Sequence, residues 1–227
     1  MSGEPLTALQ WAVLRALGRR APSFFLSGGA ALAGFHLHHR PTNDLDFFTV
    51  DGAALEEGLR ALRATASELR AGLVIRHQSP GFIRAVVDVG SDAVVVDLVH
   101  EQVRQLHDEK LEVDGVRIDP LDELMVNKMT ALVGRQEERD LVDLWFIEQR
   151  GLRVETLLAA AEAKDGGCTP STLAWLLSTF PVPPDDRLPS GVTSTALVAF
   201  RDGLVERLTV AARPTELNED AAAATRR

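Results

Sequence analysis

An Asp-x-Asp motif at the start of a predicted strand constrains the fold of this chain more than any other feature. Asp44 and Asp46 lead into an apolar run over 45–50 that predicts a strand. Because alternate residues of a strand share a face, the two carboxylates point the same way, while Leu45 and Phe47 point into a core. Neighbouring carboxylates repel each other unless a cation lies between them, and magnesium is the usual cation. A solvated strand face is the alternative interpretation.

The segment before this motif favours the metal interpretation. The apolar run 21–26 ends at Ser27-Gly28-Gly29 and is followed by a helical pattern over 30–38. This order predicts a strand, a tight turn and a helix. Glycines let the backbone approach a phosphate closely, and a helix N-terminus offers free N–H groups. The turn and the Asp-x-Asp motif together predict a phosphate cradle that faces a metal site.

A third carboxylate, Asp97, interrupts an apolar strand that is expected over 93–99. A charge in such a run is costly unless it is paired or bound to a metal. Asp97 is therefore either a satisfied structural residue or a further metal ligand.

The remaining pattern divides the chain into an α/β part and a helical part. Up to residue 119, further strands are expected over 73–77 and 82–89, an edge strand over 113–118, and helices over 6–17 and 53–71. Beyond it, helices are expected over 122–133, 137–149, 154–163, 170–179 and 194–210, with a proline-rich loop over 181–189. We therefore expect an α/β core over 1–119, a helical region over 120–212, and a flexible tail over 213–227.

Composition narrows the possible functions. The chain of 227 residues carries a formal net charge of −9, which argues against extensive, sequence-independent binding to nucleic acid. It does not argue against nucleotides, because a metal held by carboxylates can bind phosphate. A single cysteine, Cys168, excludes an internal disulfide framework and a cysteine-based zinc site. Since no apolar run approaches the roughly 20 residues of a membrane span and no signal pattern is seen, we expect a cytoplasmic protein.

The motifs resemble those of the polymerase-β-like nucleotidyltransferase superfamily and, more narrowly, of the AbiEii/AbiGii toxin family. The resemblance rests on Gly28-Gly29-x-Ala31-Leu32, His39-Arg40-x-Thr42-x-Asp44-Leu45-Asp46-Phe47, Asn127-Lys128 and Arg139-Asp140-x-x-Asp143-Leu144. It implies an α/β (α+β) fold in which a mixed sheet with flanking helices precedes a C-terminal helical region. It also implies an enzyme, a nucleotidyltransferase that is the toxin of a toxin–antitoxin or abortive-infection pair. Such a toxin would transfer NMP from an NTP to RNA, and some members modify the acceptor end of tRNA.

The resemblance also implies roles for individual residues. Asp44, Asp46 and Asp97 would hold magnesium, with two ions that bridge the triphosphate, and Asp97 would help to deprotonate the acceptor. The remaining candidate residues are expected near the nucleotide: Ser27, Gly28 and Gly29 on the β- and γ-phosphates, Arg40 and Thr42 on phosphate or as strand caps, Lys128 on phosphate, and Asp140 orienting Lys128.

Local interpretations compete with these roles. Lys128 is equally well explained as a solvated helix lysine, and Arg139 as the i,i+4 partner of Asp143, which would leave Asp140 free. The histidines and tryptophans are expected to be structural: His36, His38 and His39 at the surface or in packing, and Trp11, Trp145 and Trp175 in the core.

At the level of function, transfer to a protein side chain or a small molecule, and a catalytically silent nucleotide-binding module, stay open. An antitoxin protein is a further possible partner.

Overall fold

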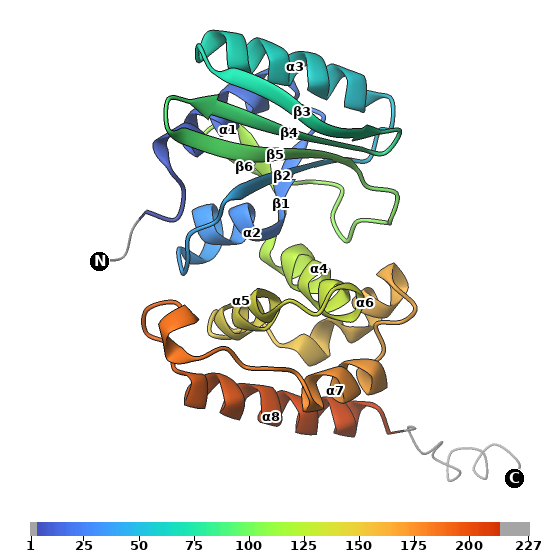
Figure 1. Ribbon diagram of the computed structural model, residues 1–227. Helices are drawn as coiled ribbons and strands as arrows, with labels where there is room; N and C mark the ends of the chain where they lie inside the picture. Colours follow the sequence, from blue (N-terminus) through green and yellow to red (C-terminus); the bar gives the residue numbers. More distant parts are fainter. Residues whose placement is uncertain (1–3, 214–227) are drawn as a thin grey trace, which may run out of the picture.

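The computed structural model describes residues 4–213, and its centre is a seven-stranded mixed sheet (Figure 1). The strand order is β3-β4-β5-β2-β1-β7-β6, in which β2 runs parallel to β5 and β1 parallel to β7. The strands are β1 (Phe25–Ser27), β2 (Asp44–Thr49), β3 (Gly72–Ser79), β4 (Phe82–Val89), β5 (Asp92–His100), β6 (Leu111–Val113) and β7 (Val116–Ile118). The predicted fold class, a mixed sheet with flanking helices and a helical C-terminal part, is confirmed. The predicted tail over 213–227 lies, apart from Arg213, outside the described residues.

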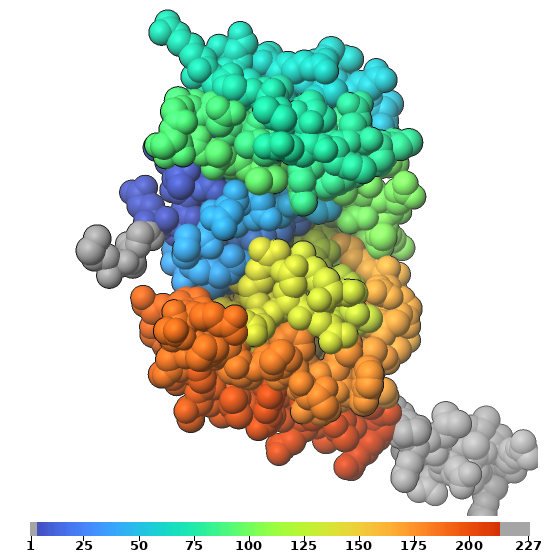
Figure 2. Space-filling model, viewed as in Figure 1, coloured from blue at the N-terminus to red at the C-terminus, as the bar shows by residue number. Residues whose placement is uncertain are grey.

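Helices flank the sheet and make up the C-terminal part. They are α1 (Ala8–Arg20), α2 (Gly28–Ala31), η1 (Leu32–Leu37), α3 (Ala54–Glu68), α4 (Leu121–Gly134), α5 (Glu138–Glu148), η2 (Val154–Leu157), α6 (Leu158–Lys164), α7 (Pro170–Ser178), η3 (Asp185–Arg187) and α8 (Ser194–Ala211). In Figure 2 the yellow-to-red C-terminal helices pack directly below the blue-to-green sheet half. Within residues 4–213, no helix combines the length and the hydropathy that a membrane crossing requires.

The two faces of the central strands differ in character. Leu45 and Phe47 of β2 are buried in the core, as the alternation predicts, while Asp44 and Asp46 lie on the opposite face. Helices α1 and α3 cover the apolar face, and α3 approaches it so closely that a Cβ on Gly58 would touch the ring of Phe24. The acidic face is therefore the one left to meet the C-terminal helices.

The helix after the glycine turn begins as an α-helix and continues as a π-helix. Residues 28–31 form α2, and residues 32–37 widen into the π-helical η1. His38 ends the helix with a positive φ of 52°. Such π-helical segments are often found at functional sites, and this one places the residues that follow it against α5.

Two predictions about the strands need correction. The strand expected over 21–26 is only Phe25–Ser27, and the edge strand expected over 113–118 is a hairpin of β6 and β7. Asp114 and Gly115 form its two-residue turn with positive φ at both positions, as a type I′ hairpin requires. Because β7 also pairs with β1, β6 is the strand at the sheet edge.

The tryptophans do not all belong to the core. Trp11 and Trp145 pack against it, but Trp175 on α7 is 70% exposed, so its predicted core position is wrong. Helix α7 buries Leu173 and Leu177 on its inner face, which leaves Trp175 on the outer face.

Candidate active site

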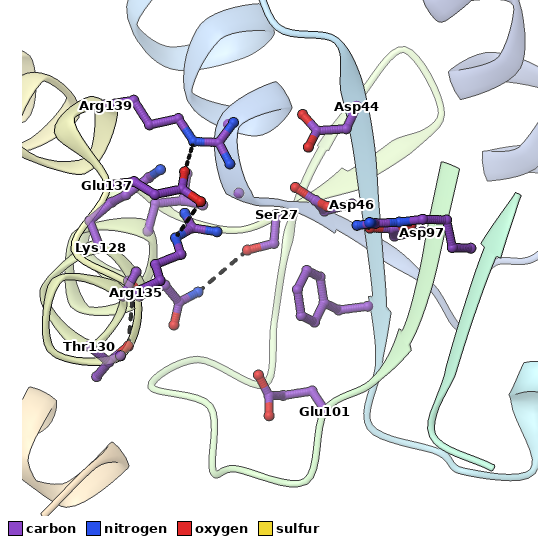
Figure 3. Close-up of a pocket in the computed structure, with 18 of the residues that line it drawn as sticks. Ser27, Asp44, Asp46, Asp97, Glu101, Lys128, Thr130, Arg135, Glu137 and Arg139 are labelled. Atoms are coloured by element: carbon purple, nitrogen blue, oxygen red, sulfur yellow. Dashed lines mark hydrogen bonds and ion pairs between the residues drawn. The ribbon is translucent and has the colours of Figure 1, made fainter. Parts of the chain in front are cut away.

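A cleft of about 660 Å³ lies between the acidic face of the sheet and helices α4 and α5. Figure 3 places Asp44, Asp46 and Asp97 along one wall and Lys128, Arg135 and Arg139 along the other. The predicted site residues that line it are Ser27, Gly28, Gly29, Arg40, Asp44, Asp46, Asp97 and Lys128. These residues come from the sheet, the glycine turn and α4. The most distant two in the sequence, Ser27 and Lys128, are 101 positions apart.

The sheet wall concentrates negative charge. Asp46 on β2 is directly paired in register with Asp97 on β5, and Asp44 lies two residues away on the same face. Burial, followed by the charges of Asp44 and Asp97, raises the pKa of Asp46 to about 7. Thr42, which is buried, donates a hydrogen bond from Oγ1 to Asp44 Oδ1 at 3.0 Å. A site with this excess of carboxylates attracts cations.

The glycine turn lies against this wall. Gly28 has a φ of +63°, and a Cβ at this position would overlap Asp46 Oδ2. A Cβ on Gly29 would lie 3.2 Å from Arg40 Nη2 and 3.3 Å from Thr42 Oγ1. Both glycines therefore permit a close approach of backbone to functional side chains. Ser27 ends β1 and is paired in register with Asp46.

The helical wall is an ionic cluster around two buried carboxylates, with an excess of positive charge. Asp140 is bound by Lys128 Nζ at 2.8 Å and by two nitrogens of Arg135 at 2.9 and 3.0 Å. Asp143 is bound by Lys128 Nζ at 2.6 Å and by Arg40 through two hydrogen bonds of 2.8 Å. Three permanent cations are thus held by two carboxylates, and both carboxylates are fully buried. The cluster presents net positive charge to a cleft whose other wall is acidic.

Two of the local interpretations of α4 and α5 are wrong. Lys128 is buried between two carboxylates instead of being solvated. Asp143 does not pair with Arg139, because Lys128 and Arg40 already occupy its oxygens; Arg139 pairs with Glu137 instead and points into the cleft. Asp140 is likewise not free.

The histidines before the Asp-x-Asp motif are structural, as predicted. His39 is buried, with Nε2 2.7 Å from Asp143 Oδ1 and its ring 4.6 Å from that of Phe146. His36 Nε2 lies 2.9 Å from the carbonyl oxygen of Asp119.

Asp97 has a partner that the sequence did not indicate. Arg84 on the neighbouring strand β4 donates from Nε to Oδ1 at 2.8 Å and from Nη2 to Oδ2 at 2.6 Å. Both carboxylate oxygens of Asp97 are therefore occupied.

Comparison with known proteins identifies the family. The family described as nucleotidyl transferase AbiEii toxin of type IV toxin–antitoxin systems matches residues 12–213. The chain belongs to this family. It is therefore an enzyme of the nucleotidyltransferase class, and the resemblance noted in the motifs is confirmed.

Solved structures support the fold of this AbiEii-family chain. JHP933 from Helicobacter pylori is 17% identical, with a TM-score of 0.57, 89% of this chain covered and 91% of that chain. A second H. pylori protein is 17% identical, with a TM-score of 0.56 and coverages of 90% and 95%. No curated protein matches the sequence significantly.

The residues of the AbiEii-type cleft fit a divalent cation at one part of the site. The family generally uses an NTP and a divalent metal, and Asp44 and Asp46 offer the paired carboxylates through which Mg²⁺ is usually held beside substrate phosphates. Burial is the main cause of the raised pKa of Asp46 and the charges of Asp44 and Asp97 come next; a cation bound at these carboxylates would oppose both effects. Among residues 4–213, however, no group of three or more metal-binding side chains is assembled. Asp97 is engaged with Arg84, so the three predicted ligands are not available together.

Several residues of the cleft carry no functional signal in the sequence motifs. Arg84, Arg135 and Glu101 line it, although none belongs to a motif that pointed to function. Arg84 alternates with the buried Ile83 and Ala85 on β4, which placed it on the polar face. That alternation is the one signal that would have found it.

Proposed function

We propose that this toxin-family enzyme is magnesium-dependent and transfers NMP from an NTP to an RNA acceptor, with the acceptor end of tRNA as the first candidate. The observation that carries the proposal is the opposition of an acidic wall and a cation-rich wall across one cleft. Carboxylates suit divalent cations, and the facing arginines and lysine suit the triphosphate that such cations accompany.

In the proposed reaction, a hydroxyl oxygen of the acceptor attacks the α-phosphorus of the NTP. A P–O bond forms to the acceptor, the bond from the α-phosphorus to the bridging oxygen breaks, and pyrophosphate leaves. Two bound magnesium ions would neutralise charge on the attacking and leaving oxygens. Asp44 and Asp46 are the residues that would hold them, together with Asp97 once its pair with Arg84 has opened. Asp97 would then accept the hydroxyl proton.

The turn and the helical wall would position the nucleotide. Backbone N–H groups of Ser27, Gly28 and Gly29 would bind the β- and γ-phosphates, with Arg40 beside Gly29 adding positive charge. Thr42 would act by orienting Asp44 through its hydrogen bond. Lys128 would contribute its charge from the cleft wall, held in place by Asp140.

The wider organisation belongs to the same proposal. We infer an α/β core over 1–119 and a helical region over 120–212, since β7 ends at Ile118 and α4 begins at Leu121. The toxin–antitoxin family implies an antitoxin partner. A cytoplasmic location follows if NTP and RNA are the substrates.

A protein side chain is the second candidate acceptor. The net charge of −9 favours it, because an acidic chain repels the RNA backbone except where local cations intervene.

The test is a labelling reaction with the purified protein, Mg²⁺, each of the four labelled NTPs, total RNA and lysate protein. Asp46→Asn is the inactive variant, and Asp92→Asn, an exposed carboxylate at the start of β5, is the matched control. Label in tRNA-sized RNA that Asp46→Asn abolishes and Asp92→Asn retains would support the proposal. Label in a protein band would instead support a protein side chain as the acceptor. Absence of label with every NTP and acceptor would contradict transfer to either.

A further inference from the structure

The pair formed by Arg84 and Asp97 differs from the other ion pairs of the cleft in its number of cations. Among the described residues Asp97 pairs with Arg84 alone, whereas Asp140 and Asp143 each bind Lys128 in addition to an arginine. The two residues lie opposite each other where β4 pairs with β5, and the guanidinium donates one hydrogen bond to each oxygen of the carboxylate. The Asp97 side chain is only 5% exposed, whereas that of Arg84 is 49% exposed and faces the cleft. The arginine is therefore the member of the pair that has solvent beside it and room to leave.

The surroundings of Asp97 explain why a cation is needed there. Asp97 shares its sheet face with Asp44 and Asp46, and its charge contributes to the raised pKa of Asp46. A poorly solvated carboxylate beside two others requires a counter-charge. In this structure Arg84 is that counter-charge, and its side chain also lies over the ring of Phe82, with 5.5 Å from Cζ to the ring centroid.

We propose that Arg84 is an exchangeable counter-ion: it holds Asp97 until a divalent cation takes that carboxylate, and the released guanidinium then binds a backbone phosphate of the RNA acceptor. The phosphate part rests on the proposed function, whereas the exchange at Asp97 does not depend on the acceptor.

The energetics favour such an exchange. The pair joins a nearly buried carboxylate to an arginine whose side chain is half-exposed, so solvent screens the charge of the arginine and the pairing costs side-chain entropy. A divalent cation carries twice the charge of the guanidinium and would attract all three carboxylates at once. Arg84 loses its partner but stays at the cleft, attached to a rigid strand.

The released side chain suits a phosphate. The planar fork of arginine matches the geometry of a phosphate as it matches a carboxylate, through two parallel hydrogen bonds. One such contact at the cleft would give a chain of net charge −9 a local site for RNA.

The first measurement is Mn²⁺ binding without nucleotide or acceptor, by titration calorimetry, for the wild type, Arg84→Gln and Arg76→Gln. Arg76 is an exposed arginine on the adjacent strand β3 and controls for the loss of one positive charge. Arg84→Gln is expected to bind Mn²⁺ roughly two- to fivefold more tightly than Arg76→Gln, the size of a partly exposed ion pair. Equal or weaker binding by Arg84→Gln would overturn the exchange.

A double-mutant cycle assigns the gain to Asp97. In an Asp97→Asn background, Arg84→Gln should bring no tightening, because no carboxylate is left to release. A gain that persists in this background would contradict the exchange. Arg84→Lys keeps the charge without the fork, is expected to give an intermediate affinity, and serves if Arg84→Gln does not fold.

The second measurement is the affinity for a labelled single-stranded RNA in the presence of Mg²⁺ at several salt concentrations. Arg84→Gln should bind RNA more weakly, with the slope of log affinity against log salt reduced by roughly 0.7, the value for one phosphate contact. Tighter Mn²⁺ binding with unchanged RNA affinity and slope would overturn the phosphate assignment and leave only the exchange at Asp97. Because the Mn²⁺ arm uses no acceptor, its failure is distinguishable from a failure of the proposed function.

Discussion

Asp46 lies close to several other charged groups of the cleft. Burial and the neighbouring Asp44 and Asp97 raise its pKa to about 7, whereas the pKa of the same carboxyl in an unfolded chain is about 4. Between these two pH values the folded protein keeps a proton that the unfolded chain has lost. The contribution of Asp46 to the free energy of unfolding therefore falls as pH rises from about 4 to about 7.

This shift predicts the behaviour of Asp46→Asn in the metal-free protein. The variant should gain stability relative to the wild type as pH rises through this window, because an amide cannot acquire the unfavourable charge. Urea unfolding of both proteins at pH 5 and pH 8 measures the difference. Mg²⁺ should stabilise the wild type more at pH 8 than at pH 5, since the proton competes with the cation. A stability difference that does not change with pH would contradict this account of Asp46.

Asp143 is the opposite case at the same scale. Burial alone would raise its pKa, but Lys128, Arg40 and His39 together hold it well below its usual range. A depressed pKa contributes stability that is present above the unfolded value of about 4 and is lost as pH falls below it. Asp143 thus stabilises the fold at neutral pH.

Removing that charge should destabilise the protein strongly. We expect Asp143→Asn to lower the free energy of unfolding by about 3–5 kcal/mol at pH 7, because Arg40 and Lys128 would remain buried without one of their carboxylates. Asp92→Asn, at an exposed carboxylate, should change it by less than about 0.5 kcal/mol. Chemical unfolding at pH 7 compares them, and similar values for the two variants would refute the structural role of Asp143.

At the scale of elements, the turn between β1 and α2 fixes where the acidic wall meets the helix. Gly28 needs its positive φ of 63°, and its missing side chain makes room for the carboxylate of Asp46. Any side chain at this position has to displace either the turn or Asp46.

We expect Gly28→Ala to cost about 1–2 kcal/mol of stability from the backbone conformation alone. It should also weaken divalent-cation binding, since the added Cβ overlaps Asp46 Oδ2. Gly81→Ala is the matched control, because Gly81 lies in the β3–β4 turn with open space around it. Thermal unfolding and Mn²⁺ titration provide the two readouts. Normal Mn²⁺ binding by Gly28→Ala would show that the turn does not govern the position of Asp46.

At the scale of the whole molecule, ion pairs of a partly exposed arginine connect α8 to α5 and η2. Arg207 on α8 bonds both oxygens of Glu148 on α5, at 2.7 and 2.9 Å, and also pairs with Glu155. The Glu148 side chain is only 3% exposed and has Arg153 as its other cation. The packing of α7 and α8 adds the apolar part of this attachment.

Arg207→Ala should therefore loosen the C-terminal helices. We expect a loss of about 1–3 kcal/mol, because a nearly buried carboxylate loses one of its two cations. Arg213→Ala, an exposed arginine just beyond α8, should have little effect. Hydrogen exchange of α8 amides together with circular dichroism would detect the change. Unaltered α8 protection in Arg207→Ala would show that apolar packing alone holds the helix.

Much of the fold was predictable because its determinants are local. The alternation of Leu45 and Phe47 with Asp44 and Asp46, the Ser27-Gly28-Gly29 turn and the helical periodicity beyond Pro120 each act over a few residues. The errors arose where local signals are weak or ambiguous. The Asp114-Gly115 turn marked a hairpin that was assigned as one strand, and the environment of Trp175 depends on which face of α7 meets the core.

The sequence by itself determined the fold class, the family and the two carboxylates of β2, since these depend on periodicity and on motifs of adjacent residues. Only the tertiary structure decided which charges pair. Asp143 bonds Arg40 from 103 positions away, and Asp97 bonds Arg84 across 13 positions, through strand register. An isolated sequence offers Asp143 several partners of equal plausibility, including Arg139 four residues before it. Folding selects among them because a buried carboxylate must be satisfied by the cations that the packed helices and strands bring within reach.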